Sequence, residues 1–310
     1  MKNFFGILSV FAVGSVYLTS CGNDDGIALA GATQANASAG EALYLRAKSE
    51  DDAGRSKKAA KLYEDVADDY PTTPSAAQAR YRQAEILEQR GEILDSFDAY
   101  QDFLTRYRGS GLYSKALNRQ TAMAQGAADG EIKSSFLGLK RRLSTDKVVE
   151  MLGKVRDNAP RSKEAAKAQF TIGELYQSRD ESKKAISAYR KLVRDQPRST
   201  YSAEALFRVG IVLMEEADRG NRNRATLELA EEAFSDYLLQ YPGHAKNAEA
   251  RRLSKNLRSR ELDRSLEIAE YYDRVGQTES AKVYYRDVLK QTKSGPSYDK
   301  ARARLSALGE

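Results

Sequence analysis

The chain has 310 residues, with 50 Lys and Arg against 44 Asp and Glu, one histidine, one cysteine and no tryptophan. A single cysteine excludes a disulfide within the chain, and a single histidine leaves carboxylates as the main ligands for any zinc site. Charges of both signs are interspersed, so the net charge of +6 indicates solvated helix faces and argues against a nucleic-acid-binding protein.

Residues 1–20 have the parts of a secretory signal: Lys2, an apolar run from Phe4 to Leu18, and small residues before a cleavage point. The run of about 15 residues is shorter than the roughly 20 that cross a bilayer. Leu18-Thr19-Ser20-Cys21 resembles the lipobox of bacterial lipoproteins, in which the cysteine receives lipid and becomes the mature N-terminus. We therefore expect lipidation at Cys21; an ordinary signal peptide with an incidental cysteine is the alternative.

Residues 21–40 are expected to be the lipid anchor, which the lipobox resemblance implies at Cys21, followed by a flexible tether, which is predicted because the segment is rich in Gly, Ala, Ser and Asn and contains little to bury. Folded structure is expected from near Glu41 almost to Leu308. No later stretch has the composition of a linker. Residues 41–310 are therefore predicted to form one elongated domain.

A pattern of helical spacing recurs six times in this domain. A small or β-branched anchor residue is followed by bulky residues four and seven positions later, and the shortest spacing between anchors is 37 residues. A repeat of this length predicts stacked helix pairs, which present a concave surface for other proteins. The anchors are Ala59, Ser96, Val148, Ala185, Ala230 and Ala281; the bulky residues are Tyr63, Tyr100, Leu152, Tyr189, Phe234 and Tyr285, then Val66, Phe103, Val155, Leu192, Tyr237 and Val288.

Flanking residues mark the ends of each helix pair. A second small residue lies twelve positions before four anchors, at Ala47, Ala84, Gly173 and Ala269, and is predicted to let the paired helices approach closely. Glycines five positions before an anchor predict the turn within a pair (Gly54, Gly91 and Gly276), and prolines twelve positions after it end the second helix (Pro71, Pro160, Pro197 and Pro242). Predicted N-caps of the next helix are Ser75, Ser162, Ser199 and Ser202.

Two repeats are irregular. The third has Phe136 in the small-residue column, so its first helix is the least well defined. In the fifth, Gly210 precedes the anchor by 20 residues, which places an insertion around residues 218–226. The basic run Arg219 to Arg224 within it, including Arg222, is either a solvated loop or a loop that meets an acidic partner or anionic headgroups. No persistent β-type alternation is present, so the predicted fold is all-α.

No catalytic or metal-binding constellation is visible. His244 lies in a Pro-Gly turn and is expected to be solvated, and no phosphate-binding glycine loop or nucleophile–base motif occurs. Most tyrosines occupy repeat columns and are expected in the core, whereas Tyr81, Tyr113 and Tyr201 lie outside the anchor columns and are candidates to face the groove. We predict a protein that is not an enzyme and needs no cofactor.

The small residue, the aromatic residue four positions later and the closing proline resemble tetratricopeptide repeats. The resemblance implies a superhelical solenoid of about five to six helix pairs. Within it, Ala233-Phe234-Ser235-Asp236-Tyr237, Gln240-Tyr241-Pro242 and Leu257-Arg258-Ser259-Arg260 resemble the BamD family, lipoproteins of the outer-membrane β-barrel assembly machinery. The repeats cover nearly all of the mature chain, and the specific match covers about 60 residues between Ala225 and Tyr285.

That resemblance implies an outer-membrane lipoprotein facing the periplasm, which binds the barrel-forming subunit through its periplasmic domains and receives unfolded outer-membrane protein clients. Arg260 matches the family's arginine in the helix that joins the last repeats, with Arg252 as a nearby second candidate and Arg219 and Arg222 in the basic loop. Ser265 stands where the family usually has glutamate. The alternative is another periplasmic repeat lipoprotein that mediates protein–protein contacts in cell-envelope or cell-wall coordination.

Overall fold

A computed structural model describes residues 30–136, 139–219 and 224–310. The predicted signal peptide, Cys21 and Arg222 lie outside these ranges. The described elements are α1 (Ala30–Asp52), α2 (Ser56–Asp69), α3 (Ala76–Gln89), α4 (Ile93–Arg106), α5 (Tyr113–Ala128), β1 (Lys133–Phe136), β2 (Leu139–Arg142), α6 (Thr145–Asn158), α7 (Lys163–Gln177), α8 (Ser182–Asp195), α9 (Ser202–Arg219), α10 (Arg224–Gln240), α11 (Asn247–Arg274), α12 (Thr278–Gln291) and α13 (Pro296–Ala307).

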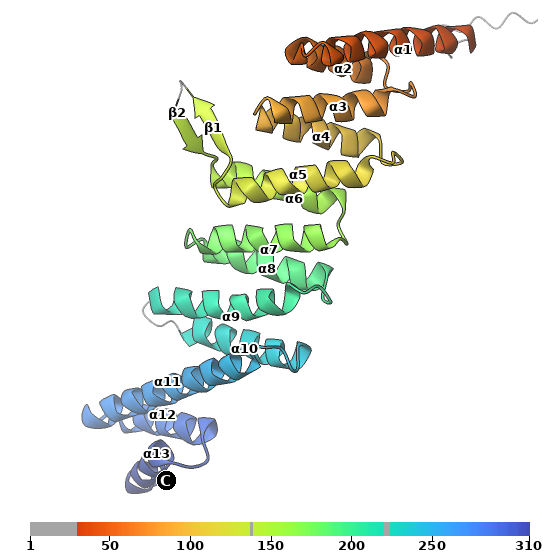
Figure 1. The fold of residues 1–310 in the computed structure, drawn as a ribbon. Helices are drawn as coiled ribbons and strands as arrows, with labels where there is room; N and C mark the ends of the chain where they lie inside the picture. The colour runs from red at the N-terminus through yellow and green to blue at the C-terminus, as the bar shows by residue number, and fades with distance from the viewer. Residues whose placement is uncertain (1–29, 137–138, 220–223) are drawn as a thin grey trace, which may run out of the picture.

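The helices form six consecutive pairs, α1/α2 to α11/α12, followed by α13. Each helix packs mainly against its neighbours in sequence, and the pairs stack into one elongated column with α1 and α13 at opposite ends (Figure 1). The predicted helical solenoid of five to six pairs is confirmed. Because contacts are local, each pair depends on the pairs on either side for its core.

The first helix begins earlier than the sequence predicts. α1 starts at Ala30, within the expected tether of residues 21–40, and residue 40 is already packed. A Cβ atom on Gly40 would lie 2.8 Å from Thr73 Cγ2 and 2.9 Å from Tyr70 Cβ. The glycine that was counted as a tether residue therefore allows α1 to approach the turn after α2, and the predicted boundary at Glu41 is too late.

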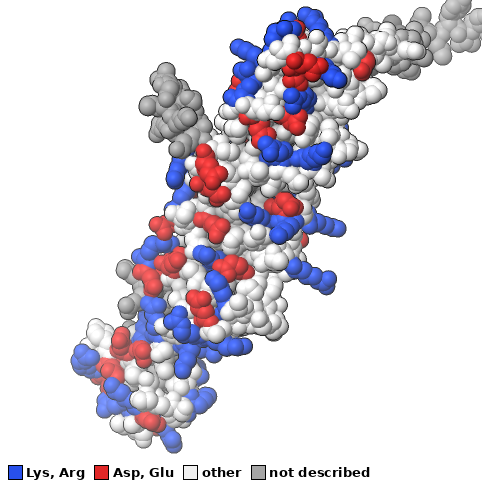
Figure 2. All heavy atoms as spheres, in the orientation of Figure 1, with Lys and Arg blue, Asp and Glu red and all other residues white. Residues whose placement is uncertain are grey.

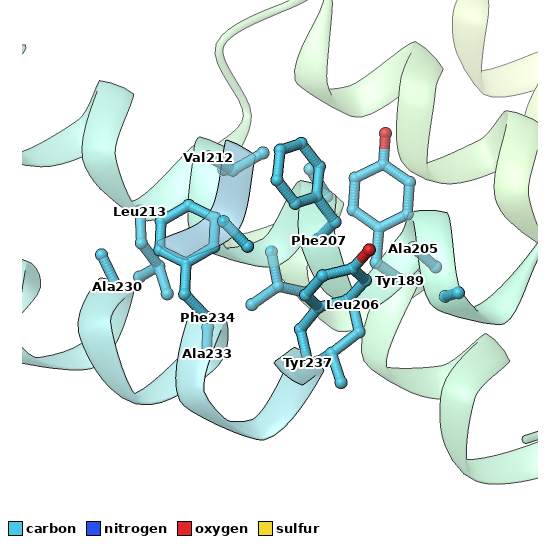
Figure 3. Close-up of a cluster of buried hydrophobic side chains, with 14 of the residues drawn as sticks. Tyr189, Ala205, Leu206, Phe207, Val212, Leu213, Ala230, Ala233, Phe234 and Tyr237 are labelled. Carbon is cyan, nitrogen blue, oxygen red and sulfur yellow. The ribbon is translucent and has the colours of Figure 1, made fainter. Parts of the chain in front are cut away.

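The repeat columns form the core, as predicted. Every anchor and every bulky residue of the six repeats is 3% exposed or less. In the fifth pair, Phe207 of α9 packs against Phe234 and Tyr237 of α10 with ring centroids 5.6 Å apart in both cases (Figure 3). Aromatic contacts of this kind recur between the two helices of other pairs, between Tyr81 and Tyr100 and between Phe170 and Tyr189.

Two buried tyrosines of the aromatic column, Tyr189 and Tyr285, have hydroxyl groups that bond to the first helix of the same pair. The Tyr189 hydroxyl donates to Gln177 Oε1 over 3.0 Å, and the Tyr285 hydroxyl donates to Asp273 Oδ2 over 3.1 Å. Both partners lie twelve residues earlier, on the last turn of the first helix. Burial raises the pKa of both phenols. Tyrosine suits this column because its ring fills the core while its hydroxyl reaches a polar edge.

The turns within pairs require a left-handed residue. Gly54, Gly91 and Gly276 have φ values of +74°, +79° and +76°, as expected for glycines that end a helix. In the fourth pair the same place, five residues before the anchor, is occupied by Asp180 at φ +59°. The described residues contain no other non-glycine with positive φ. Asp tolerates this region better than most residues, which explains why the turn survives without glycine.

The third pair contains a β-hairpin, which was not predicted from the sequence. Strands β1 and β2 form an antiparallel hairpin between α5 and α6, with Phe136 paired to Leu139. The first helix of this pair is α5, which ends well before Phe136. In the fifth pair the insertion lengthens α9 to Arg219. Of the predicted N-caps, Ser75 and Ser162 occupy the N-cap position, but only the Ser162 side chain accepts a hydrogen bond there, from Ala165 N. The Ser199 hydroxyl accepts from Tyr201 N, and the Ser202 hydroxyl donates to Gln196 O.

An ion-pair cluster closes the first turn and gives a pH-dependence prediction. Lys58 Nζ lies 3.0 Å from Glu50 Oε1, Arg55 contacts the other oxygen, and together they lower the Glu50 pKa to about 2. The pKa of Glu50 in the folded protein lies below its ordinary value of 4.5. The ionised carboxylate therefore stabilises the fold at pH values above 4.5, and this stabilisation is lost as the pH falls towards 2.

We expect a nuclear magnetic resonance titration of the Glu50 side chain to give a midpoint near 2, and Lys58→Met to move it upwards. In Glu50→Gln, amide exchange of α1 should depend less on pH between 5 and 2 than in the wild type. A Glu50 midpoint near 4.5 in the wild type would contradict the pairing.

Candidate protein-binding surface

Grooves of one kind recur along the stack. Each lies between the second helix of one pair and the following pair, at α2/α3/α4, α6/α7/α8 and α10/α11/α12. We call them the N-terminal, central and C-terminal grooves; their volumes are about 670, 300 and 480 Å³. Figure 2 shows Lys and Arg side chains interspersed with Asp and Glu along the visible face of the whole stack.

The N-terminal groove contains a buried arginine. The Arg80 side chain is 6% exposed, its Nε lies 2.7 Å from Asp102 Oδ2, and its Nη1 donates to Gln83 Oε1 over 2.8 Å. Asp68 of α2 contacts the remaining nitrogen. One guanidinium thus connects three helices of two successive pairs. Removing either carboxylate would leave a buried charge partly uncompensated, so this cluster fixes the relative position of the first two pairs.

The central groove has a neutral floor. Gln169 is 4% exposed, its Nε2 donates to Ala188 O over 3.0 Å, and its Oε1 accepts from Arg156 Nη1 over 2.9 Å. Arg156 also pairs with Asp157. Both ends of the Gln169 amide therefore have partners within the protein, and this residue positions Arg156 at the wall of the groove.

The C-terminal groove lies over the long helix α11. The first half of α11 packs on α10 through Ala250 and Leu257, and its second half packs against α12 through Ala269. Between the two cores, Arg224 Nε lies 2.6 Å from Glu261 Oε1. Burial nevertheless raises the Glu261 pKa, with the Arg224 charge opposing the shift. This groove has three cations and three carboxylates in its lining.

The predicted site residues are only partly brought together. Arg260 Nη2 lies 2.7 Å from Asp218 Oδ1 at the end of α9, with the arginine side chain 31% exposed, so Arg260 is neither buried nor free. Arg219 pairs instead with the preceding repeat: it contacts Asp180 in the turn before α8, and its Nη2 donates to Ser182 Oγ over 2.8 Å. Arg252 is exposed, and no ion pair is recorded for it in the described part of the chain.

Other predicted surface residues are packed. His244 is half-buried, and its Nδ1 lies 2.6 Å from the Tyr237 hydroxyl, so it is not the solvated loop residue expected from the sequence. Tyr81 is 9% exposed and packs against Tyr100, so it belongs to the core and not to the groove. Tyr113 is half-buried and donates to Asn158 O over 2.9 Å. Tyr201 packs on Phe170.

Within the described ranges, no group of three or more His, Cys, Asp or Glu side chains has the arrangement of a metal site. None of the described helices combines the length and the apolar character of a membrane span.

Two segments match sequence models of known repeats. Residues 23–74 and 44–111 match one tetratricopeptide-repeat model, and residues 167–199 match another. Residues 23–111 and 167–199 therefore carry tetratricopeptide repeats. This repeat fold suggests a role in protein–protein interaction, and tetratricopeptide-repeat proteins are in general non-enzymatic scaffolds. No curated protein matches the chain.

Solved structures of tetratricopeptide-repeat proteins are similar at low identity. The C-terminal part of a repeat protein from Cytophaga hutchinsonii is 14% identical, covers 88% of this chain and 93% of its own, and has a TM-score of 0.35. PilF of Pseudomonas aeruginosa is 12% identical, with coverage of 87% and 99% and a TM-score of 0.30. A repeat protein of Parabacteroides merdae is 12% identical, with the same coverage and a TM-score of 0.28.

Sequence reasoning missed the partners of the site residues and one basic surface. Asp218 was seen only as part of a loop, yet it ends α9 close to Arg260. Arg161, Lys163 and Arg198, at the turns after α6 and α8, were not singled out, although they line one hollow. The available signal was positional: Arg161 and Arg198 each follow a repeat proline and are separated by the base repeat spacing.

Proposed function

We propose that the protein is a lipid-anchored scaffold of outer-membrane protein assembly, of the BamD type. In this proposal lipid on Cys21 holds the chain in the outer membrane facing the periplasm. The C-terminal pairs bind the barrel-forming subunit through its periplasmic domains, and the N-terminal pairs receive unfolded outer-membrane protein clients. Tetratricopeptide repeats support the binding role, and the motifs between Ala225 and Tyr285 support the choice of machinery.

The main support is the placement of Arg260. It lies on α11 between Leu257, which packs with α10, and Ala269, which packs with α12, and Asp218 pairs with its guanidinium. A guanidinium has five N–H donors, so Arg260 retains donors for a carboxylate of the partner. Because one carboxylate already orients the side chain, less conformational entropy is lost when the partner binds. A partly exposed, oriented arginine has the properties of an interface hot spot.

Affinity capture from solubilised outer membranes tests the proposal. The tagged protein should recover the barrel-forming subunit, and Arg260→Ala should reduce recovery at least about tenfold, the range expected for a hot-spot arginine. Arg258→Ala is the matched control, since this arginine lies two residues away, is 68% exposed and pairs with Glu231. Recovery of other cell-envelope proteins in place of the barrel-forming subunit would overturn the assignment.

Anchoring is tested separately. Cys21→Ala should leave an uncleaved precursor in membranes or a protein released without lipid. Unchanged mature size with normal outer-membrane retention would contradict lipidation at Cys21 without affecting the repeat-mediated part of the proposal.

A further inference from the structure

A basic hollow lies at the turns that follow α6 and α8. The central groove, of about 300 Å³, adjoins a second hollow of about 530 Å³, and the two share Arg161, Asp195 and Gln196 in their linings. We call the combined surface the basic trough. Its volume lies in the range of clefts that bind ligands. Pro197, Ser199 and Thr200 provide uncharged wall between the charged side chains.

The charge of the trough distinguishes it from the two related grooves. The N-terminal groove has four cations and five carboxylates in its lining, and the C-terminal groove has three of each. The trough has five cations and two carboxylates, a net charge of +3; the cations are Arg156, Arg161, Lys163, Lys191 and Arg198. The same architecture therefore carries an excess of positive charge only here among these three surfaces.

The excess is concentrated on three side chains. Both carboxylates are already paired inside the protein: Asp157 Oδ1 lies 2.6 Å from Arg156 Nε, and Asp195 Oδ2 lies 2.6 Å from Lys191 Nζ. In contrast, Arg161, Lys163 and Arg198 are exposed, and none of the ion pairs of the described residues includes them. These three cations line one hollow whose single carboxylate, Asp195, is paired with Lys191, so the local potential is positive.

The repeat geometry produces this cluster. Arg161 follows Pro160 and Arg198 follows Pro197, so both occupy the position after the closing proline of successive repeats. The same position holds Thr72 after Pro71 and Gly243 after Pro242. Stacking of pairs places equivalent positions of neighbouring repeats side by side. Two arginines in this position therefore form a pair on the surface, whereas the first and fifth repeats have no charge there.

We propose that the basic trough binds an acidic, extended polypeptide segment, with Arg161, Lys163 and Arg198 pairing with its carboxylates. Because the trough is recessed, an extended peptide can enter it, whereas a flat bilayer would contact the protruding residues around it first. The trough therefore favours a peptide as its ligand. The interspersed Asp157 and Asp195 would repel a uniformly charged polyphosphate, but a peptide can place neutral residues opposite them. The site is separate from the Arg260 region and does not rest on the proposed assembly function.

Fluorescence anisotropy with the full repeat domain and a labelled peptide of alternating Glu and Ser tests the proposal. We expect binding that weakens steeply with added salt, and no binding of the alternating Lys and Ser peptide. Arg161→Glu with Arg198→Glu should weaken binding by about tenfold or more, because like charges then face the peptide. Circular dichroism verifies that the variant is folded.

A matched control separates a local site from general charge attraction. Arg108→Glu with Lys115→Glu makes the same change in net charge elsewhere on the stack: Arg108 lies in the turn after α4 and Lys115 at the start of α5, and both are exposed. This variant should keep its affinity within about twofold. Equal losses in both variants, or no binding of the Glu peptide to the wild type, would overturn the proposal. The proposal would also be overturned if the protein bound phosphatidylglycerol vesicles through Arg161 and Arg198 and excess Glu peptide did not reduce that binding.

Discussion

Phe234→Ala is expected to lower the free energy of unfolding by about 3–5 kcal/mol, the range for removing a buried aromatic ring. Phe234 is fully buried between α9 and α10, and its ring contacts Phe207 and covers Gly210. Little can move into the vacated space, because the backbone of α9 at Gly210 has no side chain to rotate inwards. Chemical denaturation of the repeat domain measures the loss.

The loss should be local as well as large. In a repeat stack, stability depends on each pair and on its interfaces with its neighbours, so α9 and α10 should lose amide protection before α1 and α2 do. Leu239→Ala is the control in the same helix: Leu239 is 79% exposed, and its truncation should change stability by less than about 0.5 kcal/mol. A similar loss in both variants, or uniform loss of protection along the chain, would contradict this description of the core.

Gly210→Ala and Gly173→Ala form the second prediction, in which two physical effects have opposite signs. Alanine in a helix interior is favoured over glycine by about 0.5–1 kcal/mol. A Cβ atom on Gly210 would lie 2.6 Å from the Phe234 ring, and one on Gly173 would overlap the Tyr189 ring. Overpacking of this kind costs about 1–3 kcal/mol. We expect the steric effect to dominate and both variants to be less stable than the wild type by about 1–2 kcal/mol.

Gly153→Ala is the matched control. Gly153 lies in the interior of α6, and the nearest atom to a Cβ there is Arg156 Nη2 at 3.9 Å. With no steric cost, the helix preference alone should stabilise this variant by about 0.5–1 kcal/mol. Opposite signs in the two sets of variants, measured by denaturant midpoints, identify the glycine–aromatic contact as the constraint. Stabilisation by Gly210→Ala would show that α9 and α10 can separate at little cost.

The glycine–aromatic contact also explains why the fold was predictable. One helix pair is described by a small residue, an aromatic residue and a closing proline at constant offsets. When this pattern repeats, each pair has apolar residues on both of its sides, and stacking against the neighbouring pairs buries them. The correspondence extended to Gly210, which was assigned to its column despite the eight-residue insertion and lies against Phe234. Local spacing was sufficient because the contacts that build this fold are themselves local.

The candidate site was less predictable because it depends on long side chains. The ion pair between Arg260 and Asp218 joins residues 42 apart on two helices, and neither residue occupies a repeat column. The direction of Arg219, away from α11 and towards Asp180, depends on where α9 ends. The direction in which an exposed arginine side chain extends, and so its ion-pair partner, is not indicated by any periodic pattern in the sequence.

By itself, the sequence determined the helix pairs, their order, their buried columns and the glycine turns, since each depends on residues within one repeat. The tertiary structure decided that α1 begins at Ala30, that a hairpin separates α5 from α6, and that Arg161, Lys163 and Arg198 share one hollow. These features arise from contacts between repeats or from insertions. Their geometry follows from how neighbouring pairs stack, which no single stretch of the chain encodes.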